Sequence, residues 1–246
     1  MKRILLLQHI WDNHKGYVGQ LLDEYAIPYD VIDVEHESIP DPKQYAAVIA
    51  FGGSQHIYAI ERYPYLVQER AVLHTILEYD IPFLGICLGG QLLADACGGK
   101  VRKHILAEFG FLEVQLTEQG KRDPLFSDLP GYQNVFHWHE DTFDLPTGAI
   151  LLATSNTTEN QAFRYGERAY GLQYHIEIDD NTLNTWLYNP ECKESLLEKH
   201  GMQLYIATEQ ARSALLPVYQ QHSRIVVENF LRISEVRPMG NAHKEY

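Results

Sequence analysis

The stretch PFLGICLGGQLLADACGG, residues Pro82 to Gly99, decides how this chain folds. It begins as a short apolar strand, and from Leu88 its apolar residues repeat at helical spacing, so a buried strand runs almost directly into a helix. Cys87 sits at the junction, where Gly85 and Gly89 leave room for a strained backbone and a closely approaching ligand. The positive end of the helix favours a thiolate. The stretch predicts a nucleophilic cysteine, with the Leu88 N–H as an oxyanion donor.

A small buried cysteine in a glycine-rich turn, or a phosphate-binding turn, would give the same local pattern. A second stretch, AYGLQYHIEI (Ala169–Ile178), bears on that choice. Its apolar strand ends at His175, and on an extended backbone Glu177 shares a face with His175 and can hold the ring. A solvated His-x-Glu is the alternative. Together with Cys87, however, this pair completes the constellation expected for a thiol nucleophile.

A third feature is the pair Gly52-Gly53, which ends the apolar strand Tyr45–Phe51. In a parallel sheet the end of this strand lies at the same edge as the Cys87 elbow. A backbone N–H of the pair could therefore supply a second oxyanion donor. A plain loop with two glycines is the alternative.

The first half of the chain alternates strands with helices, which favours a mainly parallel sheet covered on both faces. The predicted strands are Arg3–Gln8, Pro28–Val34, Tyr45–Phe51 and Pro82–Ile86, and the predicted helices are Tyr17–Tyr25, Tyr65–Tyr79 and Leu88–Cys97. Short strands with turn residues between them follow at Phe111–Thr117, Asn134–Trp138, Ile150–Ala153, Gln161–Tyr165 and Ala169–Tyr174, and they favour antiparallel additions to the sheet edge.

From about residue 180 to 235 the pattern is helical, with segments Thr182–Tyr188, Lys193–Lys199 and about Leu204 to Ile233. We therefore predict a three-layer α/β/α fold, built as one domain over residues 1–246 with a helical C-terminal extension. This extension could cover one face of the sheet or mediate dimerisation. The polar tail Arg237–Tyr246 is expected to fray.

Composition narrows the function classes. Lys plus Arg number 20 and Asp plus Glu 33, for a net charge of −13, which disfavours nucleic acid and anionic membrane as partners. The three cysteines include no Cys-x-x-Cys pair, so neither a disulfide framework nor a zinc cluster is indicated. The apolar run Ile4–Leu7 is too short for a signal peptide, and no run approaches a membrane span of about 20 residues. We expect a cytoplasmic enzyme, where thiols stay reduced.

The motifs, in their order along the chain, resemble the class I (triad) glutamine amidotransferase family. The resemblance is strongest to stand-alone members similar to the glutaminase domain of GMP synthetase. It rests on Gly52-Gly53-Ser54, on Gly85, Cys87, Gly89 and Gln91, and on His175 with Glu177. Two further stretches agree with it: DPLFSDLP with FHWHEDTFDLP (Asp123–Pro146), and NQAFRYGERAYGLQYHIE (Asn160–Glu177).

The resemblance implies an enzyme that needs no cofactor and acts on glutamine or another γ-glutamyl compound. Cys87 would attack the side-chain carbonyl, His175 would move the protons, and Glu177 would hold the imidazole. The N–H groups of Gly53 and Leu88 would bind the oxyanion. Gln91 would help to hold the amino-acid end of the substrate.

Three residues depart from the family pattern. Ile176 stands where proline is frequent, and Ser54 stands where proline is usual. Glu140 replaces a frequent glycine, so a carboxylate there could narrow the pocket mouth or change which γ-glutamyl donor fits.

Two functions stay open. The chain carries no Gly-x-x-x-x-Gly-Lys loop, so a glutaminase would need a separate ammonia-accepting synthetase chain. A stand-alone γ-glutamyl hydrolase or peptidase would need no partner. An exposed apolar patch at the pocket mouth would favour a partner, and a polar rim would favour the hydrolase. A non-catalytic binding module is a third interpretation, against which the complete set of Cys87, His175 and Glu177 argues.

His137 and His139 flank Trp138 and invite comparison with a metal pair. Zinc sites need three or four convergent ligands and no matching third is evident, so we predict no metal. The resemblance implies instead that this stretch lines the glutamine pocket. Cys97 is expected to be packing, and Cys192 is expected to be inert.

Overall fold

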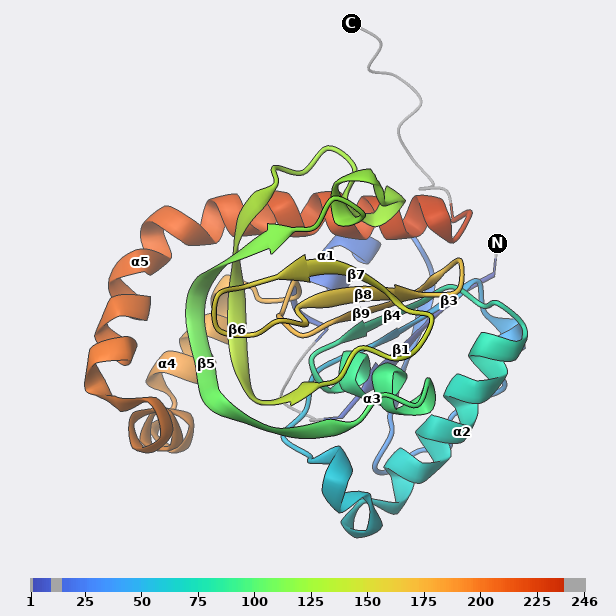
Figure 1. Ribbon diagram of the computed structural model, residues 1–246, viewed down its shortest axis with the longest axis horizontal. Helices are drawn as coiled ribbons and strands as arrows, with labels where there is room; N and C mark the ends of the chain where they lie inside the picture. The colour runs from blue at the N-terminus through green and yellow to red at the C-terminus, as the bar shows by residue number, and fades with distance from the viewer. Residues whose placement is uncertain (1, 10–14, 237–246) are drawn as a thin grey trace, which may run out of the picture.

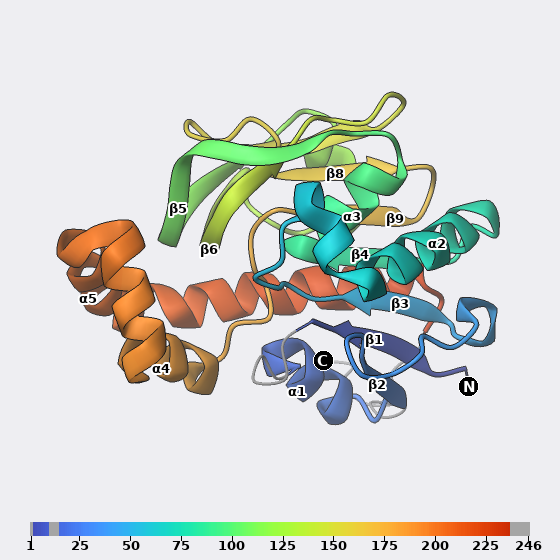
Figure 2. The same ribbon diagram turned by 90° about the horizontal axis from the view of Figure 1, so that it is seen from below.

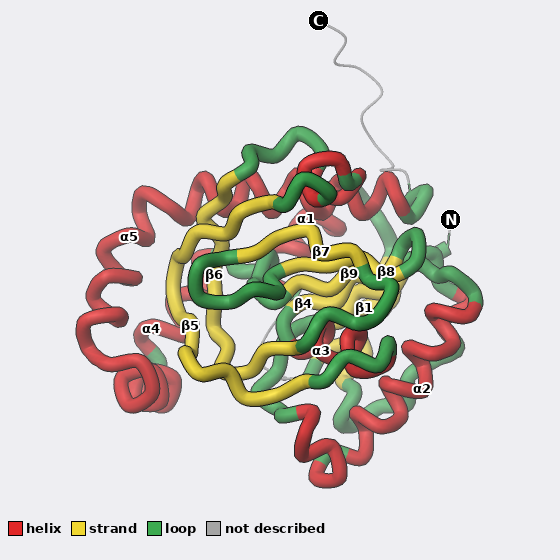
Figure 3. Tube along the Cα trace, in the orientation of Figure 1, coloured by secondary structure: helices red, strands yellow, loops and turns green. Residues whose placement is uncertain are grey.

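The computed structural model describes residues 2–9 and 15–236, and it forms a sheet surrounded by helices (Figures 1 and 3). The strands are β1 (Ile4–Gln8), β2 (Tyr29–Asp33), β3 (Ala47–Ala50), β4 (Phe83–Ile86), β5 (Val101–Leu116), β6 (Tyr132–Phe143), β7 (Ile150–Thr154), β8 (Ala162–Tyr165) and β9 (Ala169–Leu172). The α-helices are α1 (Gly16–Glu24), α2 (Pro64–Glu78), α3 (Leu88–Ala96), α4 (Asp180–Tyr188) and α5 (Pro190–Ile233). Short 3₁₀ helices are η1 (Pro42–Gln44), η2 (Ile57–Arg62), η3 (Gly120–Arg122) and η4 (Pro124–Phe126).

One sheet contains all nine strands, in the order β2-β1-β3-β4-β9-β8-β7-β5-β6. The pairs from β2 to β9 are parallel, and the pairs from β9 to β6 are antiparallel. Strand β1 shows why the parallel part reads as an unbroken apolar run. Ile4 and Leu6 point into one core and Leu5 and Leu7 into the other, because helices cover both faces.

Two helical layers enclose the parallel strands (Figure 2). On one face, α1 and the C-terminal part of α5 pack through residues such as Leu21 and Phe230. On the other face, α2 and α3 pack through residues such as Leu73 and Leu92. The predicted three-layer α/β/α fold with a mainly parallel sheet, antiparallel additions and a helical C-terminal segment is confirmed.

The antiparallel part differs from the prediction in two respects. Strands β5 and β6 form one long, curved ribbon, where the sequence indicated short strands at 111–117 and 134–138 (Figure 1). The register of this ribbon shifts between Lys103 and Glu108, which breaks the alternation that sequence reasoning uses. Strand β9 was also expected among the edge additions. It instead lies in the sheet interior, parallel to β4 and antiparallel to β8.

The C-terminal helices follow the predicted segments. Helix α5 bends at Gly201, where φ is 80° and ψ is 163°, so it consists of two parts that match the predicted break between Lys199 and Leu204. The first part and the beginning of the second part pack with α4 against β5 and β6, through residues such as Leu196 and Tyr219, and the remainder of the second part covers the sheet. The tail predicted to fray, Arg237–Tyr246, lies outside the described residues, and the single-domain assignment stays a prediction. Within the described ranges, no helix is both long and apolar enough to cross a bilayer.

Candidate active site

Cys87 occupies the turn between β4 and α3, as the sequence predicts. Its backbone has φ 51° and ψ −108°, a conformation that costs a non-glycine residue roughly 1–3 kcal/mol. Two backbone bonds hold the turn in place: Cys87 N donates to Leu172 O at 2.8 Å, and Gly89 N donates to Phe51 O at 3.2 Å. The strained turn is thus fixed between β3 and β9, and it points the thiol to the carboxyl edge of the sheet.

The predicted oxyanion loop lies directly against this elbow. A Cβ on Gly52 would lie 2.9 Å from His175 Cε1 and 3.4 Å from Cys87 Cβ. A Cβ on Gly53 would lie 2.6 Å from Leu88 Cδ2. The structure therefore brings Gly52 and Gly53 next to Cys87 and Leu88, at a spacing that leaves room for glycine alone. Leu88 is the first residue of α3, so its N–H has no carbonyl one turn earlier in the helix.

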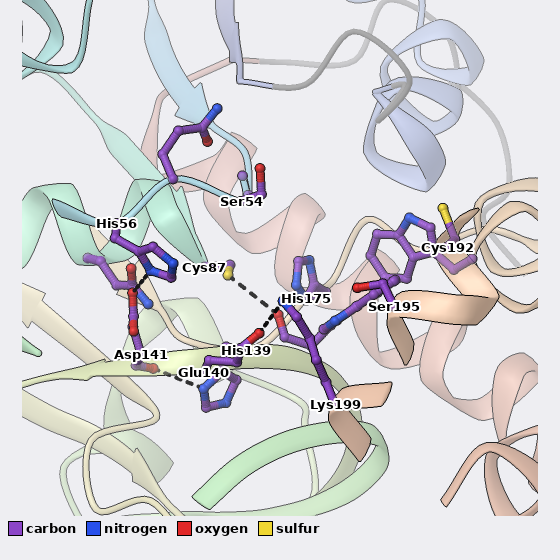
Figure 4. Close-up of a pocket in the computed structure, with 16 residues that line it drawn as sticks. Ser54, His56, Cys87, His139, Glu140, Asp141, His175, Cys192, Ser195 and Lys199 are labelled. Atoms are coloured by element: carbon purple, nitrogen blue, oxygen red, sulfur yellow. Dashed lines mark hydrogen bonds and ion pairs between the residues drawn. The ribbon is translucent and has the colours of Figure 1, made fainter. Parts of the chain in front are cut away.

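His175 reaches the thiol from an irregular segment, and not from a strand end as predicted. Strand β9 stops at Leu172, and the His175 N–H donates to Phe136 O on β6 at 2.8 Å. The ring nitrogen Nδ1 lies 2.6 Å from Glu177 Oε1, while Ile176 N donates to Glu177 Oε2 at 2.9 Å. The other ring nitrogen, Nε2, is buried and has no hydrogen-bond partner among the described residues, and the ring lies beside Cys87, as Figure 4 shows.

The environment of His175 favours its charged form. Burial alone would lower the pKa of this imidazole. The negative charge of Glu177 and the contact with Cys87 outweigh burial and raise the His175 pKa well above its ordinary value. Since both His175 and Glu177 are buried, little solvent screens this interaction.

A cavity of about 260 Å³ opens above the thiol. Its inner part is formed by Gly52, Gly53, Cys87, Gln91 and His175. Gln91 is buried, and its Nε2 donates to Gln173 Oε1 at 3.2 Å. All seven residues that the sequence singled out therefore lie at or beside one cavity.

A profile of known families matches most of this chain. The model described as "Glutamine amidotransferase class-I" covers residues 9–191. The chain belongs to this family.

The relatives of this chain agree with its assignment to the class I glutamine amidotransferase family. The glutamine amidotransferase-like protein YfeJ of Salmonella typhimurium is 32% identical over 158 residues, which cover 63% of this chain and 66% of that protein. A glutamine-hydrolyzing GMP synthase chain of Pyrococcus abyssi, named as one of the subunits of that enzyme, is 37% identical over 109 residues, which cover 44% of this chain and 56% of that one. The matched part thus spans less than two thirds of these curated relatives.

Solved structures of the family superpose over nearly the whole chain. A glutamine amidotransferase from Thermotoga maritima has a TM-score of 0.81 and 32% identity, over 95% of this chain and 98% of that one. A glutamine amidotransferase from Methylobacillus flagellatus has a TM-score of 0.85 over all of both chains, and at 22% identity it supports the fold alone. The C-terminal helices therefore belong to the fold that this chain shares with these two solved structures.

Sequence reasoning missed one wall of the cavity. Helix α4 and the first part of α5 contribute Trp186, Cys192, Ser195 and Lys199. Cys192, for which the sequence indicated no role, lies among these lining residues. The Trp186 ring stands edge-on to the His175 ring, with centroids 5.5 Å apart. The amphipathic pattern of these helices indicated that they were helical, but it carried no signal of which side chains face the thiol.

The wall formed by β6 matches the expectation that FHWHED lines the pocket, except at Phe136 and His137, which are buried and do not line the cavity. Trp138, His139, Glu140 and Asp141 line the cavity, whereas His137 lies fully buried behind them. His56 and Ser54 complete the mouth from the loop after β3 (Figure 4).

A third candidate ligand that the sequence did not reveal joins the two histidines. Within residues 2–9 and 15–236, Glu108, His137 and His139 are the one group that could hold a metal ion, with ligand atoms within 4.8 Å of one another. The carboxylate is already well supplied with donors. Glu108 Oε2 lies 2.9 Å from His139 Nε2, and it accepts hydrogen bonds from Thr158 Oγ1 at 2.7 Å and Gln161 Nε2 at 3.0 Å.

The pKa shifts in this cluster agree with a hydrogen-bonded network around an ionised Glu108. Burial alone would raise the pKa of Glu108, but hydrogen bonds from His139 and Thr157 hold it well below its usual range. Burial, reinforced by the charge on His139, lowers the pKa of His137 to about 3, so His137 is neutral near pH 7. We interpret the cluster as a network that fixes β5 against β6 behind the cavity wall.

Proposed function

We propose that this chain hydrolyses the side-chain amide of glutamine through a γ-glutamyl thioester on Cys87. The observation that carries the proposal is the contact of His175 with both Cys87 and Glu177. A cysteine nucleophile is activated when a base lies beside the thiol and a carboxylate orients that base, and here all three groups are buried. Family membership and the glutamine-hydrolyzing relatives support the same reaction.

In the first half of this reaction the Cys87 sulfur attacks the amide carbon, and the carbonyl electron pair moves to oxygen. The N–H groups of Gly53 and Leu88 stabilise that oxyanion. When the tetrahedral intermediate collapses, the C–N bond breaks and His175 donates a proton to the leaving nitrogen, which departs as ammonia. Glu177 keeps Nδ1 protonated and offsets the imidazolium charge.

In the second half, His175 removes a proton from water while the water oxygen attacks the thioester carbon. The C–S bond then breaks, and glutamate and the Cys87 thiolate are released. Gln91 lies on the floor of the cavity, and we propose that its buried amide helps to position the substrate.

Release of glutamate by the purified chain tests this mechanism. We expect glutamine turnover from the wild type and none from Cys87→Ala, with unchanged circular dichroism. Cys97→Ala is the matched control, because this thiol lies half-buried at the end of α3 and burial raises its pKa to about 12. Turnover by Cys87→Ala equal to that of the wild type would contradict the mechanism.

A stand-alone γ-glutamyl hydrolase is the second candidate, and the polar cavity mouth favours it. At the rim, an ion pair joins Glu140 to Lys199, and a hydrogen bond joins His56 to Asp141. A side-by-side comparison of glutamine with γ-glutamyl dipeptides separates the candidates. Dipeptide turnover well above that of glutamine selects the hydrolase, and the reverse selects the glutaminase.

A synthetase partner is supported by different observations. The Pyrococcus abyssi relative is named as one of the subunits of GMP synthase, which implies that this enzyme has a further chain. In the present chain, Ile105 and Leu106 are 93% and 54% exposed, in the segment of β5 where the register of the β5–β6 ribbon shifts. We propose that an ammonia-accepting chain, if the protein is a glutaminase, contacts this apolar segment.

A further inference from the structure

The cavity mouth carries one ion pair that the mechanism does not use. Glu140 Oε1 on β6 lies 2.5 Å from Lys199 Nζ on α5, and both side chains line the cavity above Cys87 (Figure 4). The side chains are 23% and 47% exposed, so both can still reach a ligand. Lys199 is the only lysine or arginine among the described residues that line this cavity.

The ion pair lies within reach of a substrate bound at Cys87. Trp138 O is 3.9 Å from Cys87 Sγ, and Glu140 follows two residues later on the same face of β6, about 7 Å further along. An extended glutamine spans about 5 Å from its side-chain amide carbon to its α-carboxylate carbon. A glutamine with its amide carbon at Cys87 is therefore long enough for its α-ammonium and α-carboxylate to approach the ion pair in the same cavity.

Other charges at the mouth are already engaged. Asp141 is buried, and its two carboxylate oxygens lie 2.7 Å from His56 Nδ1 and 3.3 Å from Tyr58 Oη. Glu140 and Lys199 pair with each other at a partly exposed site, where such a pair contributes little stability, about 0–1 kcal/mol. Little free energy is therefore lost when a ligand that carries both a positive and a negative charge separates Glu140 from Lys199.

We propose that Glu140 and Lys199 recognise the amino-acid head group of the donor. Glu140 accepts hydrogen bonds from the α-ammonium, and Lys199 donates to the α-carboxylate. This inference rests on the proposed function of Cys87, and it defines the donor class. The donor is a γ-glutamyl compound with both α-groups free, and glutamine within a peptide chain or acylated on nitrogen is excluded.

Two variants and three donors test the assignment. N-acetyl-L-glutamine lacks the ammonium charge, and L-glutaminamide lacks the carboxylate charge. Glu140→Gln should reduce the preference in kcat/KM for glutamine over N-acetylglutamine, and Lys199→Gln should reduce the preference over glutaminamide. Each reduction should be roughly 10- to 100-fold, the range for a hydrogen bond to a charged group, and it should fall mainly on KM.

Two controls separate recognition from structural support. Lys193→Gln removes a lysine from the same part of α5, where Lys193 packs over the Tyr205 ring and does not line the cavity. It should leave both preferences unchanged. The reciprocal double variant Glu140→Lys with Lys199→Glu can restore an ion pair in reversed order. Recovery of the wild-type donor preferences by this double variant would overturn the proposal, because it would show that the ion pair only supports the structure of the cavity mouth.

Alkylation of Cys87 distinguishes failure of this inference from failure of the proposed function. Iodoacetamide needs only the thiol, whereas 6-diazo-5-oxo-L-norleucine also presents an amino-acid head group. Unchanged donor preferences in variants that still release glutamate overturn the inference and leave the function standing. No release, with no selective labelling by the diazo ketone, overturns the function and the inference with it. If the wild type releases no glutamate but its Cys87 is labelled, the labelling rates decide instead. The inference then requires the rate with the diazo ketone, divided by the rate with iodoacetamide, to be lower in Glu140→Gln and in Lys199→Gln than in the wild type.

Discussion

Glu177 Oε1 lies 2.6 Å from His175 Nδ1, and the second oxygen of the same carboxylate accepts the Ile176 N–H. One carboxylate thus holds both the ring and the backbone next to it. Because the contact fixes which ring nitrogen carries a proton, it leaves the other nitrogen directed at Cys87.

Replacement of this carboxylate by an amide is expected to reduce catalysis strongly. Glu177→Gln keeps the size of the side chain but cannot offset the imidazolium charge, so kcat should fall by roughly 10²- to 10⁴-fold. Steady-state glutamate release measures the effect, with circular dichroism as the check on folding. A loss of less than about threefold would remove Glu177 from the mechanism.

The pH dependence of stability should report the raised pKa of His175. A histidine whose pKa is raised on folding stabilises the fold fully below its unfolded value, about 6.5, and this contribution is lost as pH rises through the folded value. The Tm of the wild type relative to His175→Gln should therefore fall as the pH rises above about 6.5. His74→Gln, at an exposed position on α2, is the matched control for the loss of a histidine side chain. A flat difference for His175→Gln would count against the raised pKa.

The Glu108 network should be essential for stability. Glu108→Gln leaves buried histidines without their carboxylate, and removal of one member of a buried pair costs about 3–5 kcal/mol. Urea denaturation measures this loss, and Glu113→Gln, at an exposed site on the same strand, should cost almost nothing. Because the Glu108 pKa is depressed, its contribution is present above pH 4.5 and is lost as pH falls, so the difference should narrow in acid.

Chelation tests the interpretation of the same cluster. If the hydrogen bonds to Glu108 account for its charge, EDTA followed by dialysis should leave the Tm and the glutamate release unchanged. A drop in Tm that Zn²⁺ reverses would instead show that Glu108, His137 and His139 hold a metal ion.

The close approach at Gly52 predicts a defect confined to the site. Gly52→Ala places a Cβ 2.9 Å from His175 Cε1, which forces the ring away from the thiol. We expect glutamate release to fall at least tenfold, because small misplacements of reacting groups are costly, with a smaller effect on Tm. Gly131→Ala is the control, since its Cβ would meet only an ordinary contact at 3.5 Å. Equal kinetics for the two variants would contradict the packing argument.

Local rules predicted most of the parallel half from sequence. The elbow at Cys87 was predictable because apolar strand, cysteine, glycines and helix follow one another without a gap. The proximity of His175 and Glu177 was predicted on a wrong premise, since the strand ends at Leu172 and a bridge to Phe136 shapes the segment instead. The placement of Lys199 was not predictable, because it depends on how two helices pack against a ribbon distant in sequence.

The bend at Gly201 has a consequence for how this protein can diversify. It divides α5 so that the part holding the sheet together is separate from the part that carries Lys199 over the cavity. Residues 180–200 are nevertheless tied to the second part of α5, for example by Arg212 Nη1 to Asn184 Oδ1 at 2.8 Å and Tyr205 Oη to Leu187 O at 3.2 Å, so an exchange that alters the cavity wall has to include both parts of the helix. Chimaeras that join the C-terminal helices of one family member to the remaining chain of another should show the donor preference of the protein that supplied the helices.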